Sequence, residues 1–339
     1  MKKVVDESMF HGAVSVEQGD GWLRPWRLPF DRLDLFVAPE DSLANRACHS
    51  SGVRLRFETD STRVGIEVQP MASEPGEPAN RLDLTIDGEL IDSLEVADRS
   101  TCVTFDGLKH GAKIVDVWLP QGGPIKVTGI VLDDDASCRT AEDSNPKWVT
   151  YGSSLTHCCA AHSPARTWPA IVARRKGFNL TSLGYGGNCC LEPMVAMMIR
   201  DLPADFISLK LGINCIGGAL SPRTFAAAVT GLVQIIREKK PSTPIALISP
   251  IGYPPNETEP NVVGHTIEQM RHDIRDVHAR LVARGDGNLH HFNGLDVFNL
   301  DEIARYAEDQ CHPDGDGIEV MAENFIQRVI AKMPLPHPP

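Results

Sequence analysis

A pair of serines near the middle of the chain has the setting for nucleophilic chemistry. The apolar run 147–151 predicts a β-strand, and it ends at Gly152, which permits a tight turn. Ser153 and Ser154 come next. A serine at such a strand-to-helix turn projects its hydroxyl into a cleft, where a helix N-terminus stabilises nearby negative charge. The alternative is that one of the two serines only caps the helix.

A base for that serine is available near the other end of the chain. Asp309 and His312 lie three residues apart in a short turn before the last predicted helix. On such a turn the carboxylate accepts a hydrogen bond from the histidine Nδ1–H, which leaves Nε2 to take a proton from a serine. A single Asp-x-x-His also occurs as an incidental polar pair, so the spacing alone leaves both interpretations open.

Hydrogen-bond donors for a developing negative charge follow two other predicted strands. The segment 183–188, Leu-Gly-Tyr-Gly-Gly-Asn, has three glycines that let the backbone approach a ligand and expose its N–H groups. Asn214 follows the third strand and can point its side-chain amide into the same cleft. The structural alternatives are a flexible loop and a turn-forming asparagine.

The order of the predicted elements brings these segments together. From Lys147 onward short apolar runs alternate with helical stretches, which predicts a parallel sheet covered on both faces. The expected strands are 147–151, 178–183, 205–211, 244–249 and 288–292, and the expected helices are 164–176, 190–200, 221–239, 261–284 and 316–332. Ligands of such sheets bind at the carboxyl ends of the strands, where all four polar segments lie.

The first part of the chain has a different pattern. Up to about residue 133, apolar and polar residues alternate with a period of two in short runs, as in Val53, Leu55 and Phe57. Asp87-Gly88 after another such run is a strong hairpin signal. These short alternating runs predict an antiparallel β-sandwich.

The chain is therefore expected to have three parts. They are a β-sandwich domain over residues 1–133, an acidic and polar linker over 134–146, and an α/β domain over 147–339.

The four polar segments, taken in this order, resemble the SGNH superfamily of GDSL-like serine hydrolases over roughly residues 146–335. The segments that carry the resemblance are Gly-Ser-Ser-Leu-Thr-His, Leu-Gly-Tyr-Gly-Gly-Asn, Lys-Leu-Gly-Ile-Asn and Asp-Gln-Cys-His. The resemblance implies a three-layer, flavodoxin-like domain, and it is greatest to a bacterial branch that carries a jelly-roll-like β-sandwich in front. That branch includes esterases and an acyltransferase of a tetracycline pathway. A Gly-x-Ser-x-Gly elbow, as in ordinary α/β-hydrolases, does not surround Ser154.

The resemblance implies a role for each candidate residue. Ser154 matches the nucleophile, His312 matches the general base, and Asp309 matches the residue that orients the histidine. The backbone N–H groups of Ser154 and Gly187 and the side chain of Asn214 match the three donors of an oxyanion hole. This machinery needs no cofactor and no metal ion.

Two positions depart from the family's usual sequence. Ser153 stands where the family usually has aspartate, and Cys215 follows the candidate oxyanion asparagine where aspartate is frequent. Neither position handles the essential proton, so the departures concern the substrate and the efficiency and leave the class intact.

The composition narrows the choice of partners. The 339 residues carry a formal net charge of −12, which disfavours nucleic acids and anionic membranes. The chain has nine cysteines, including two adjacent pairs, and no apolar segment follows Met1-Lys2-Lys3, which favours reduced thiols in the cytoplasm. We expect a small-molecule acyl ester as the binding partner, no nucleic acid and no membrane, with the oligomeric state left open.

Several histidines and cysteines raise the alternative of a zinc site. They are His157, Cys158, Cys159, His162, Cys189 and Cys190. Adjacent cysteines are poor tetrahedral partners and the Cys-x-x-Cys spacing is absent, so we expect buried apolar cysteines and no metal. His157 lies one helical turn from Ser154 and could line an acyl pocket, although a position on the helix surface is favoured.

A cluster of aromatic and basic residues precedes the first clear strands. Trp22, Arg24, Trp26 and Arg27 could bind a sugar or an acyl group, but a segment that packs the two domains together is favoured.

Three functions fit these features. The first is hydrolysis of a small or medium acyl ester, with carbohydrate esters among the substrates. The second is acyl transfer to an alcohol in secondary metabolism, and the third is glycan binding by an inert protein. The complete set of site residues disfavours the third function, and the first two differ only in the acceptor that the pocket binds.

Overall fold

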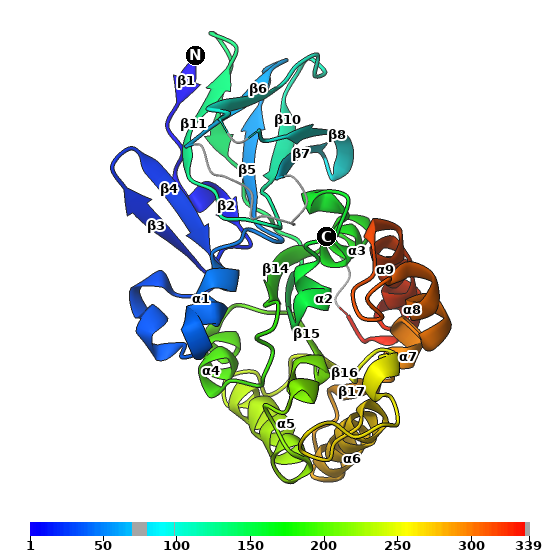
Figure 1. Cartoon of the computed structure of the whole chain (residues 1–339). Coiled ribbons are helices and arrows are strands. Elements are labelled where there is room, and N and C mark those ends of the chain that lie inside the picture. The colour runs from blue at the N-terminus through cyan, green and yellow to red at the C-terminus, as the bar shows by residue number, and fades with distance from the viewer. Residues whose placement is uncertain (70–79, 98, 336–339) are drawn as a thin grey trace.

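The computed structural model describes residues 1–69, 80–97 and 99–335, and it places a β-sandwich above an α/β unit (Figure 1). The sandwich belongs to the first part of the chain and the parallel sheet to the second. The predicted fold class is therefore confirmed.

Two antiparallel sheets form the sandwich within the described residues. The first has the order β3-β4-β11-β6-β9 with β1 beside β11, and the second has the order β12-β5-β10-β7-β8 with β2 beside β5. The strands of the first sheet are β1 (Lys2–Lys3), β3 (Ser15–Gly19), β4 (Trp22–Trp26), β6 (Val64–Val68), β9 (Cys102–Phe105) and β11 (Val127–Leu132). The strands of the second are β2 (Phe10–His11), β5 (Arg54–Thr59), β7 (Arg81–Ile86), β8 (Glu89–Glu95), β10 (Lys113–Trp118) and β12 (Arg139–Thr140).

The hairpin predicted at Asp87-Gly88 joins β7 to β8. Both residues have positive φ, 52° for Asp87 and 86° for Gly88, as a two-residue type I′ turn requires. The alternating residues before it behave as predicted, since Leu82 and Leu84 are fully buried between the two sheets.

The second part of the chain forms a parallel sheet with the order β14-β13-β15-β16-β17. Its strands are β13 (Lys147–Gly152), β14 (Asn179–Gly184), β15 (Phe206–Lys210), β16 (Ile245–Ile248) and β17 (Leu289–Phe292). This order is that of flavodoxin-like folds, and the chain reverses direction along the sheet between β13 and β15, where such folds bind ligands.

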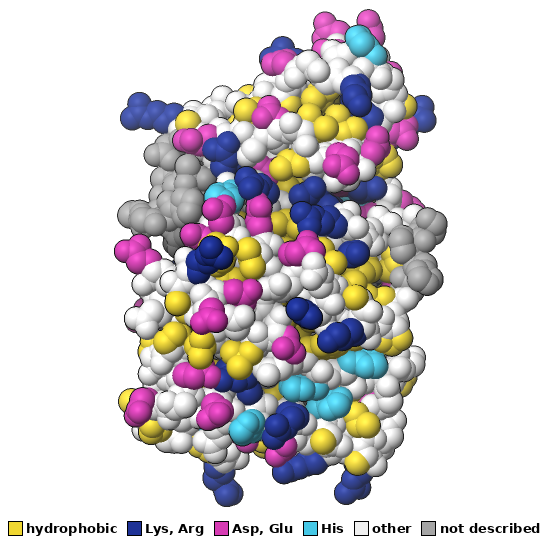
Figure 2. Space-filling model, turned by 90° about the vertical axis from the view of Figure 1, so that its right-hand side faces the viewer, with side chains coloured by type: hydrophobic (Ala, Val, Ile, Leu, Met, Phe, Trp, Pro, Cys, Tyr) yellow, Lys and Arg dark blue, Asp and Glu magenta, His cyan; other side chains and the backbone are white. Residues whose placement is uncertain are grey.

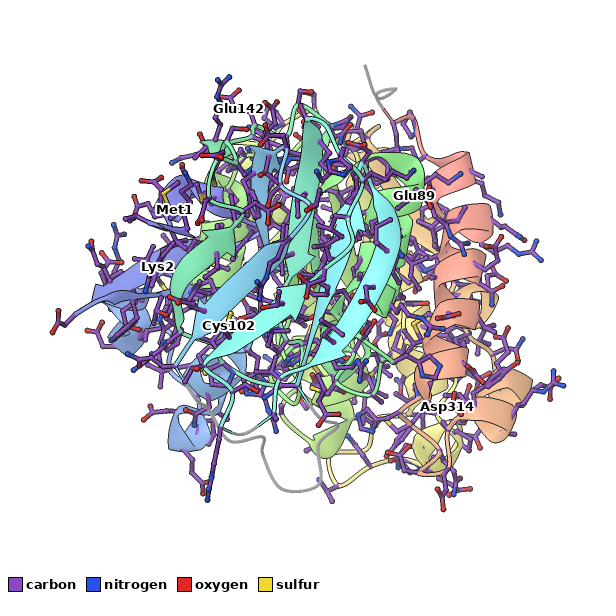
Figure 3. All side chains as sticks on the ribbon, turned by 90° about the horizontal axis from the view of Figure 1, so that it is seen from above. Met1, Lys2, Glu89, Cys102, Glu142 and Asp314 are labelled. Atoms are coloured by element: carbon purple, nitrogen blue, oxygen red, sulfur yellow. The ribbon has the colours of Figure 1, made fainter. Side chains whose placement is uncertain are left out.

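Helices cover both faces of this sheet. The α-helices of the described chain are α1 (Ser42–Ala47), α2 (Ser154–His157), α3 (Trp168–Lys176), α4 (Pro193–Asp201), α5 (Pro222–Arg237), α6 (Ile267–Ala283), α7 (Gly294–Val297), α8 (Leu300–Tyr306) and α9 (Gly315–Arg328). Helix α3 packs against α9, whereas α5 packs against both α4 and α6. Viewed from above, α9 lies on the right-hand side of the molecule, with Asp314 at its start (Figure 3).

The core of the α/β unit also contains residues from the first part of the chain. Trp148 stacks on Phe206 and Phe325 at its centre. Trp26, Leu28, Phe36, Leu43 and Ala47 join the same apolar cluster, apart from the separate cluster inside the sandwich. The segment that ends in α1 therefore packs with the α/β unit, although it precedes most of the sandwich in sequence.

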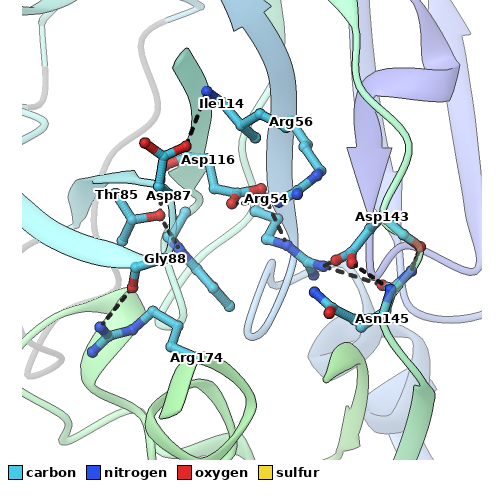
Figure 4. Close-up of polar contacts among 12 residues, drawn as sticks. Arg54, Arg56, Thr85, Asp87, Gly88, Ile114, Asp116, Asp143, Asn145 and Arg174 are labelled. Atoms are coloured by element: carbon cyan, nitrogen blue, oxygen red, sulfur yellow. Dashed lines mark hydrogen bonds and ion pairs between the residues drawn. The ribbon is translucent and has the colours of Figure 1, made fainter. Parts of the chain in front are cut away.

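Two buried arginines hold the two parts of the chain together. Arg54 of β5 reaches between Asp116 at 3.4 Å and Asp143 at 2.6 Å, and it also donates to Asn179 Oδ1 of β14 at 3.1 Å (Figure 4). Arg27 is fully buried and donates to the backbone carbonyls of Ser182 and Gly184, which end β14.

The segment 134–146, expected to be a linker, is packed against the sandwich. Its strand β12 pairs with the edge of β5, and its Asp143 is buried in the ion pair with Arg54. An acidic sequence that looks free to solvent is held here because its carboxylate neutralises a buried arginine. The division of the chain into separate domains at these boundaries stays a prediction.

The surface mixes charges of both signs. The face in Figure 2 shows basic and acidic side chains interspersed, without a continuous basic area. Among the described helices, none has the length and apolar character needed to cross a bilayer.

Candidate active site

Ser154 is the first residue of α2, at the carboxyl end of β13. The buried Ser153 is the N-cap of this helix, and its hydroxyl accepts a hydrogen bond from the Leu155 N–H at 3.3 Å. The Ser154 hydroxyl lies 2.8 Å from Nε2 of His312. The capping role that the sequence offers as an alternative therefore falls on Ser153, and the Ser154 hydroxyl bonds the histidine.

The turn before α9 holds His312 against Asp309. Asp309 Oδ2 lies 2.6 Å from His312 Nδ1, and Oδ1 accepts hydrogen bonds from the backbone N–H groups of Cys311 at 2.9 Å and His312 at 2.7 Å. Gln310 adopts a φ of 62°, in the left-handed region, which closes this turn. The carboxylate thus fixes both the backbone and the ring, and Nε2 faces the serine.

Neighbouring groups in this turn shift the pKa values of both His312 and Asp309. Contact with the Cys311 thiol, followed by the hydrogen bond to Asp309, raises the pKa of His312 from 6.5 to about 9, against the opposing effect of burial. Burial would raise the pKa of Asp309, but the hydrogen bonds from His312 and Cys311 outweigh it and the pKa is lowered. The pair is therefore poised as a carboxylate and an imidazole that holds a proton strongly.

The glycine segment after β14 forms a tight turn beside Ser154. The turn from Tyr185 to Asn188 is closed by a 3.0 Å backbone hydrogen bond, and Gly187 has a φ of 74°. A positive φ at the third position of such a turn favours glycine. A Cβ placed on Gly186 would lie 3.6 Å from Ser154 Cβ, which puts this backbone next to the serine.

Asn214 follows β15 and faces the same turn. Its Oδ1 accepts a hydrogen bond from the backbone N–H of Cys189 at 3.0 Å. Because the oxygen is engaged on that side, the amide nitrogen is left to donate elsewhere. Cys215 after it is fully buried, and its thiol lies 3.9 Å from the carbonyl oxygen of Cys189.

All five candidate residues line one pocket of about 950 Å³, namely Ser154, Gly187, Asn214, Asp309 and His312. The apolar part of its wall includes Leu155, Ile213, Ile216, Ile318 and Met321. The sequence order of the four segments therefore translates into one site at the carboxyl ends of the strands, as predicted. The catalytic roles of these residues remain proposals.

Sequence reasoning missed two polar residues of this pocket, Arg46 and Tyr253. Arg46 belongs to α1, and its neighbour Ser42 donates to Asn188 Oδ1 at 2.7 Å, so the first part of the chain reaches the glycine turn. No local motif marks Arg46, because its place in the pocket depends only on how α1 packs on the α/β unit.

The surface position favoured for His157 is wrong. The residue is fully buried and also lines the pocket. Its Nε2 lies 2.8 Å from the backbone oxygen of Gln121, and Ser51 donates to its carbonyl at 2.7 Å. A one-turn helix offers an exposed side in isolation, but here the first part of the chain covers that side.

Four residues of the zinc alternative belong to no group of three candidate metal ligands among the described residues, namely Cys158, His162, Cys189 and Cys190. His162 bonds Asp316 on α9 at 2.8 Å, and burial raises the pKa values of the Cys158 and Cys189 thiols, which keeps them protonated. Cys158 and Cys189 are buried, as expected for apolar cysteines, whereas Cys159 and Cys190 are only partly buried.

The aromatic and basic cluster is divided between two roles. Arg24 lies 4.3 Å from the centre of the Trp26 ring, and Lys126 lies 4.0 Å from that of Trp22. Arg27 alone reaches the α/β unit with polar contacts, while Trp26 packs in its core. The domain-packing interpretation is therefore confirmed for Trp26 and Arg27.

Both parts of the chain match the profiles of known protein families. The profile of the GDSL-like Lipase/Acylhydrolase family matches residues 146–331, more than half of the chain. The profile of the SsfX3 N-terminal domain matches residues 8–124. A search among curated proteins found no match.

Solved structures resemble the whole chain or most of it. The salicylyl-acyltransferase SsfX3 from a tetracycline biosynthetic pathway is 34% identical over 99% of both chains, with a TM-score of 0.89. A candidate GDSL-like lipase from Bacteroides ovatus ATCC 8483 is 23% identical over 99% of both chains, with a TM-score of 0.79. A family two carbohydrate esterase from Clostridium thermocellum is 17% identical over 84% of this chain and 94% of its own, with a TM-score of 0.64. The last two likenesses concern the fold alone.

Proposed function

This chain belongs to the GDSL-like lipase/acylhydrolase family, and we propose that it transfers acyl groups through a covalent acyl-serine formed at Ser154. The family makes it an esterase or an acyltransferase. The observation that supports this serine is the hydrogen-bonded row from Ser154 through His312 to Asp309, with distances of 2.8 Å and 2.6 Å.

The first step is attack on an ester carbonyl. His312 Nε2 takes the proton of Ser154 as Oγ bonds to the carbonyl carbon, and Asp309 stabilises the imidazolium that forms. The tetrahedral oxyanion is held by the N–H groups of Ser154 and Gly187 and by the amide nitrogen of Asn214. The imidazolium then protonates the leaving alcohol, and an acyl-serine remains.

The second step depends on the acceptor. We propose hydrolysis of a small or medium acyl ester as the main reaction, because His312 and Asp309 are 48% and 55% exposed, so water reaches the acyl-serine. The apolar wall that includes Ile213, Ile216 and Met321 suits the hydrocarbon part of the acyl group.

Transfer to an alcohol is the second candidate. It is supported by the 34% identity to the salicylyl-acyltransferase, which extends over both parts of the chain. A pocket of about 950 Å³ also offers space for an acceptor beside the acyl group. In that reaction the alcohol takes the place of water, and His312 removes its proton.

The experiment is a product screen by mass spectrometry. p-Nitrophenyl esters from acetyl to octanoyl, a salicylyl ester and acetylated sugars are incubated with the full chain, with and without added alcohols. We expect free acid from at least one donor, and a new ester only if the protein transfers. Ser153→Ala should retain activity, whereas Ser154→Ala should have none. No product from any donor with a folded protein, or equal turnover by Ser154→Ala, would contradict the proposal.

A further inference from the structure

Three side chains that could bind a metal ion lie together at the pocket, apart from the proposed acyl-transfer residues. The ligand atoms that His49, His157 and Cys159 can offer all lie within 4.8 Å of one another. His49 lies in the segment between α1 and β5, whereas the other two follow Ser154 at the end of α2. The cluster is therefore formed only when the first part of the chain packs on the α/β unit.

The hydrogen bonding of His157 defines which ring nitrogen is available. Nε2 lies 2.8 Å from the backbone oxygen of Gln121, and a carbonyl oxygen only accepts, so Nε2 carries the proton. The lone pair is then on Nδ1, and no donor among the described residues reaches this buried atom. In metal-binding histidines one ring nitrogen binds the ion, and the N–H of the other nitrogen commonly donates to a backbone carbonyl, which orients the ring. His157 has this arrangement.

Charge determines which ion is favoured. Arg27 Nη2 lies 3.4 Å from His157 Nε2, and Arg46 lines the same pocket, so both guanidinium groups oppose a cation. A Cys159 thiolate compensates one positive charge. Two imidazole nitrogens and one sulfur also select zinc and related transition metals over magnesium and calcium, which prefer oxygen.

We propose that His49, His157 and Cys159 form a binding site for a transition-metal ion such as zinc, with one coordination position directed to the pocket. His157 and Cys159 both line the pocket, which leaves that position accessible from it. Binding releases the Cys159 thiol proton to solvent and forms a metal–sulfur bond. The ion has no part in the proposed acyl transfer, so this inference stands apart from the proposed function.

The test uses the full chain, freed of metal by dialysis against a chelator, and titrates it with cobalt(II). A cobalt–thiolate bond gives a charge-transfer band in the near ultraviolet. We expect this band to saturate at one equivalent and to disappear when zinc is added. Cys159→Ser should remove the band and weaken zinc binding by at least about 100-fold. Loss of a residue that only hydrogen-bonds a metal ligand weakens binding by at most about 100-fold, and loss of a ligand itself should cost more.

Two matched thiol variants locate the ion. Cys311 and His312 also line the pocket and offer sulfur and nitrogen, so Cys311→Ser tests that competing place. Cys102 on β9 of the sandwich, labelled in Figure 3, is an exposed control. Both variants should keep the band, and so should Ser154→Ala, which has no acyl transfer.

Two outcomes would overturn the site. One is the absence of a cobalt band in the folded wild-type protein. The other is a band that persists in Cys159→Ser and is lost in Cys311→Ser, which would place the ion at the catalytic histidine. His157 is fully buried and Cys159 is half-buried, so replacing Cys159 disturbs the fold less. The Cys159→Ser variant is therefore the main test, and circular dichroism checks that it is folded. If Cys159→Ser does not fold, His49→Gln takes its place with the same expected loss.

Discussion

Asn214 Oδ1 accepts a hydrogen bond from the backbone N–H of Cys189 at 3.0 Å, and this contact joins the end of β15 to the glycine turn after β14. The two segments that supply the proposed oxyanion donors are thereby held together. The orientation of the Asn214 amide is fixed by the same backbone that presents Gly187.

Two replacements of Asn214 distinguish its proposed hydrogen bond to the oxyanion from its structural hydrogen bond with Cys189. Asn214→Ala should lower kcat by about 10²–10³, the effect of losing one oxyanion donor, with little change in KM. Asn214→Asp keeps an acceptor for the Cys189 N–H but has no N–H to donate, so it should lose activity at nearly unchanged stability. Steady-state kinetics and thermal melting measure both effects, and a wild-type kcat in Asn214→Ala would remove this residue from the site.

The pH profile should report the titration of His312. The proposed base works only when neutral, and its pKa is raised to about 9. We therefore expect kcat/KM to rise by about tenfold per pH unit towards a plateau above pH 9. The sign follows from the protonated form, which dominates below the pKa and cannot accept the serine proton. A plateau that begins near pH 6.5 would show an unshifted base.

Cys311 should be the main cause of that shift. Its thiol lies 4.0 Å from His312 Nε2, and it raises the pKa of His312 more than Asp309 does. Cys311→Ala should therefore move the midpoint of the kcat/KM profile towards lower pH and make the enzyme faster at pH 7. If the midpoint stays in place, Asp309 alone sets the pKa of the base.

Arg27 should be a main source of stability between the two parts of the chain. Arg27→Met leaves buried carbonyls of Ser182 and Gly184 without a donor, and we expect the free energy of unfolding to fall by at least about 3 kcal/mol. Arg24→Met is the matched control, because Arg24 pairs with Glu17 at the partly exposed edge of the sandwich and should matter by less than about 1 kcal/mol. Urea denaturation compares the two, and equal effects would contradict the assignment.

Gly184 should tolerate no side chain. A Cβ there would lie 2.3 Å from the His157 backbone nitrogen and 2.4 Å from the Thr156 carbonyl carbon. Gly184→Ala should therefore push α2 and Ser154 out of position, lowering both stability and kcat. Gly231→Ala in α5, where a Cβ meets nothing within 4 Å, should instead stabilise the protein by about 0.5–1 kcal/mol. Normal kcat in Gly184→Ala would contradict the close packing.

Local pattern was sufficient for the parallel sheet and for the elements that carry the site. The strand expected at 244–249 is β16 at Ile245–Ile248, because a buried parallel strand is marked by its continuous apolar run. The helix expected from 261 begins only at Ile267, since Gly264 has a φ of 77° and Thr266 caps the helix. Such boundaries depend on single backbone angles, which periodicity does not encode.

Contacts between distant segments could not be predicted in this way. Arg46 and His49 have no motif around them, and their positions beside the pocket follow from the packing of α1 on the α/β unit. His157 was misplaced for the same reason, because Gln121 and Ser51, which cover it, belong to the other part of the chain.

The most direct test of the account is covalent labelling with a fluorophosphonate, followed by peptide mapping. The reagent phosphonylates a serine that a neighbouring base activates, so it reads the proposed contact between Ser154 and His312 without knowledge of the substrate. We expect one label per chain, on Ser154, which is retained in Ser153→Ala and strongly slowed in His312→Ala. A label on Ser153, or no label on a protein that hydrolyses esters, would contradict the proposal that Ser154 is the nucleophile activated by His312.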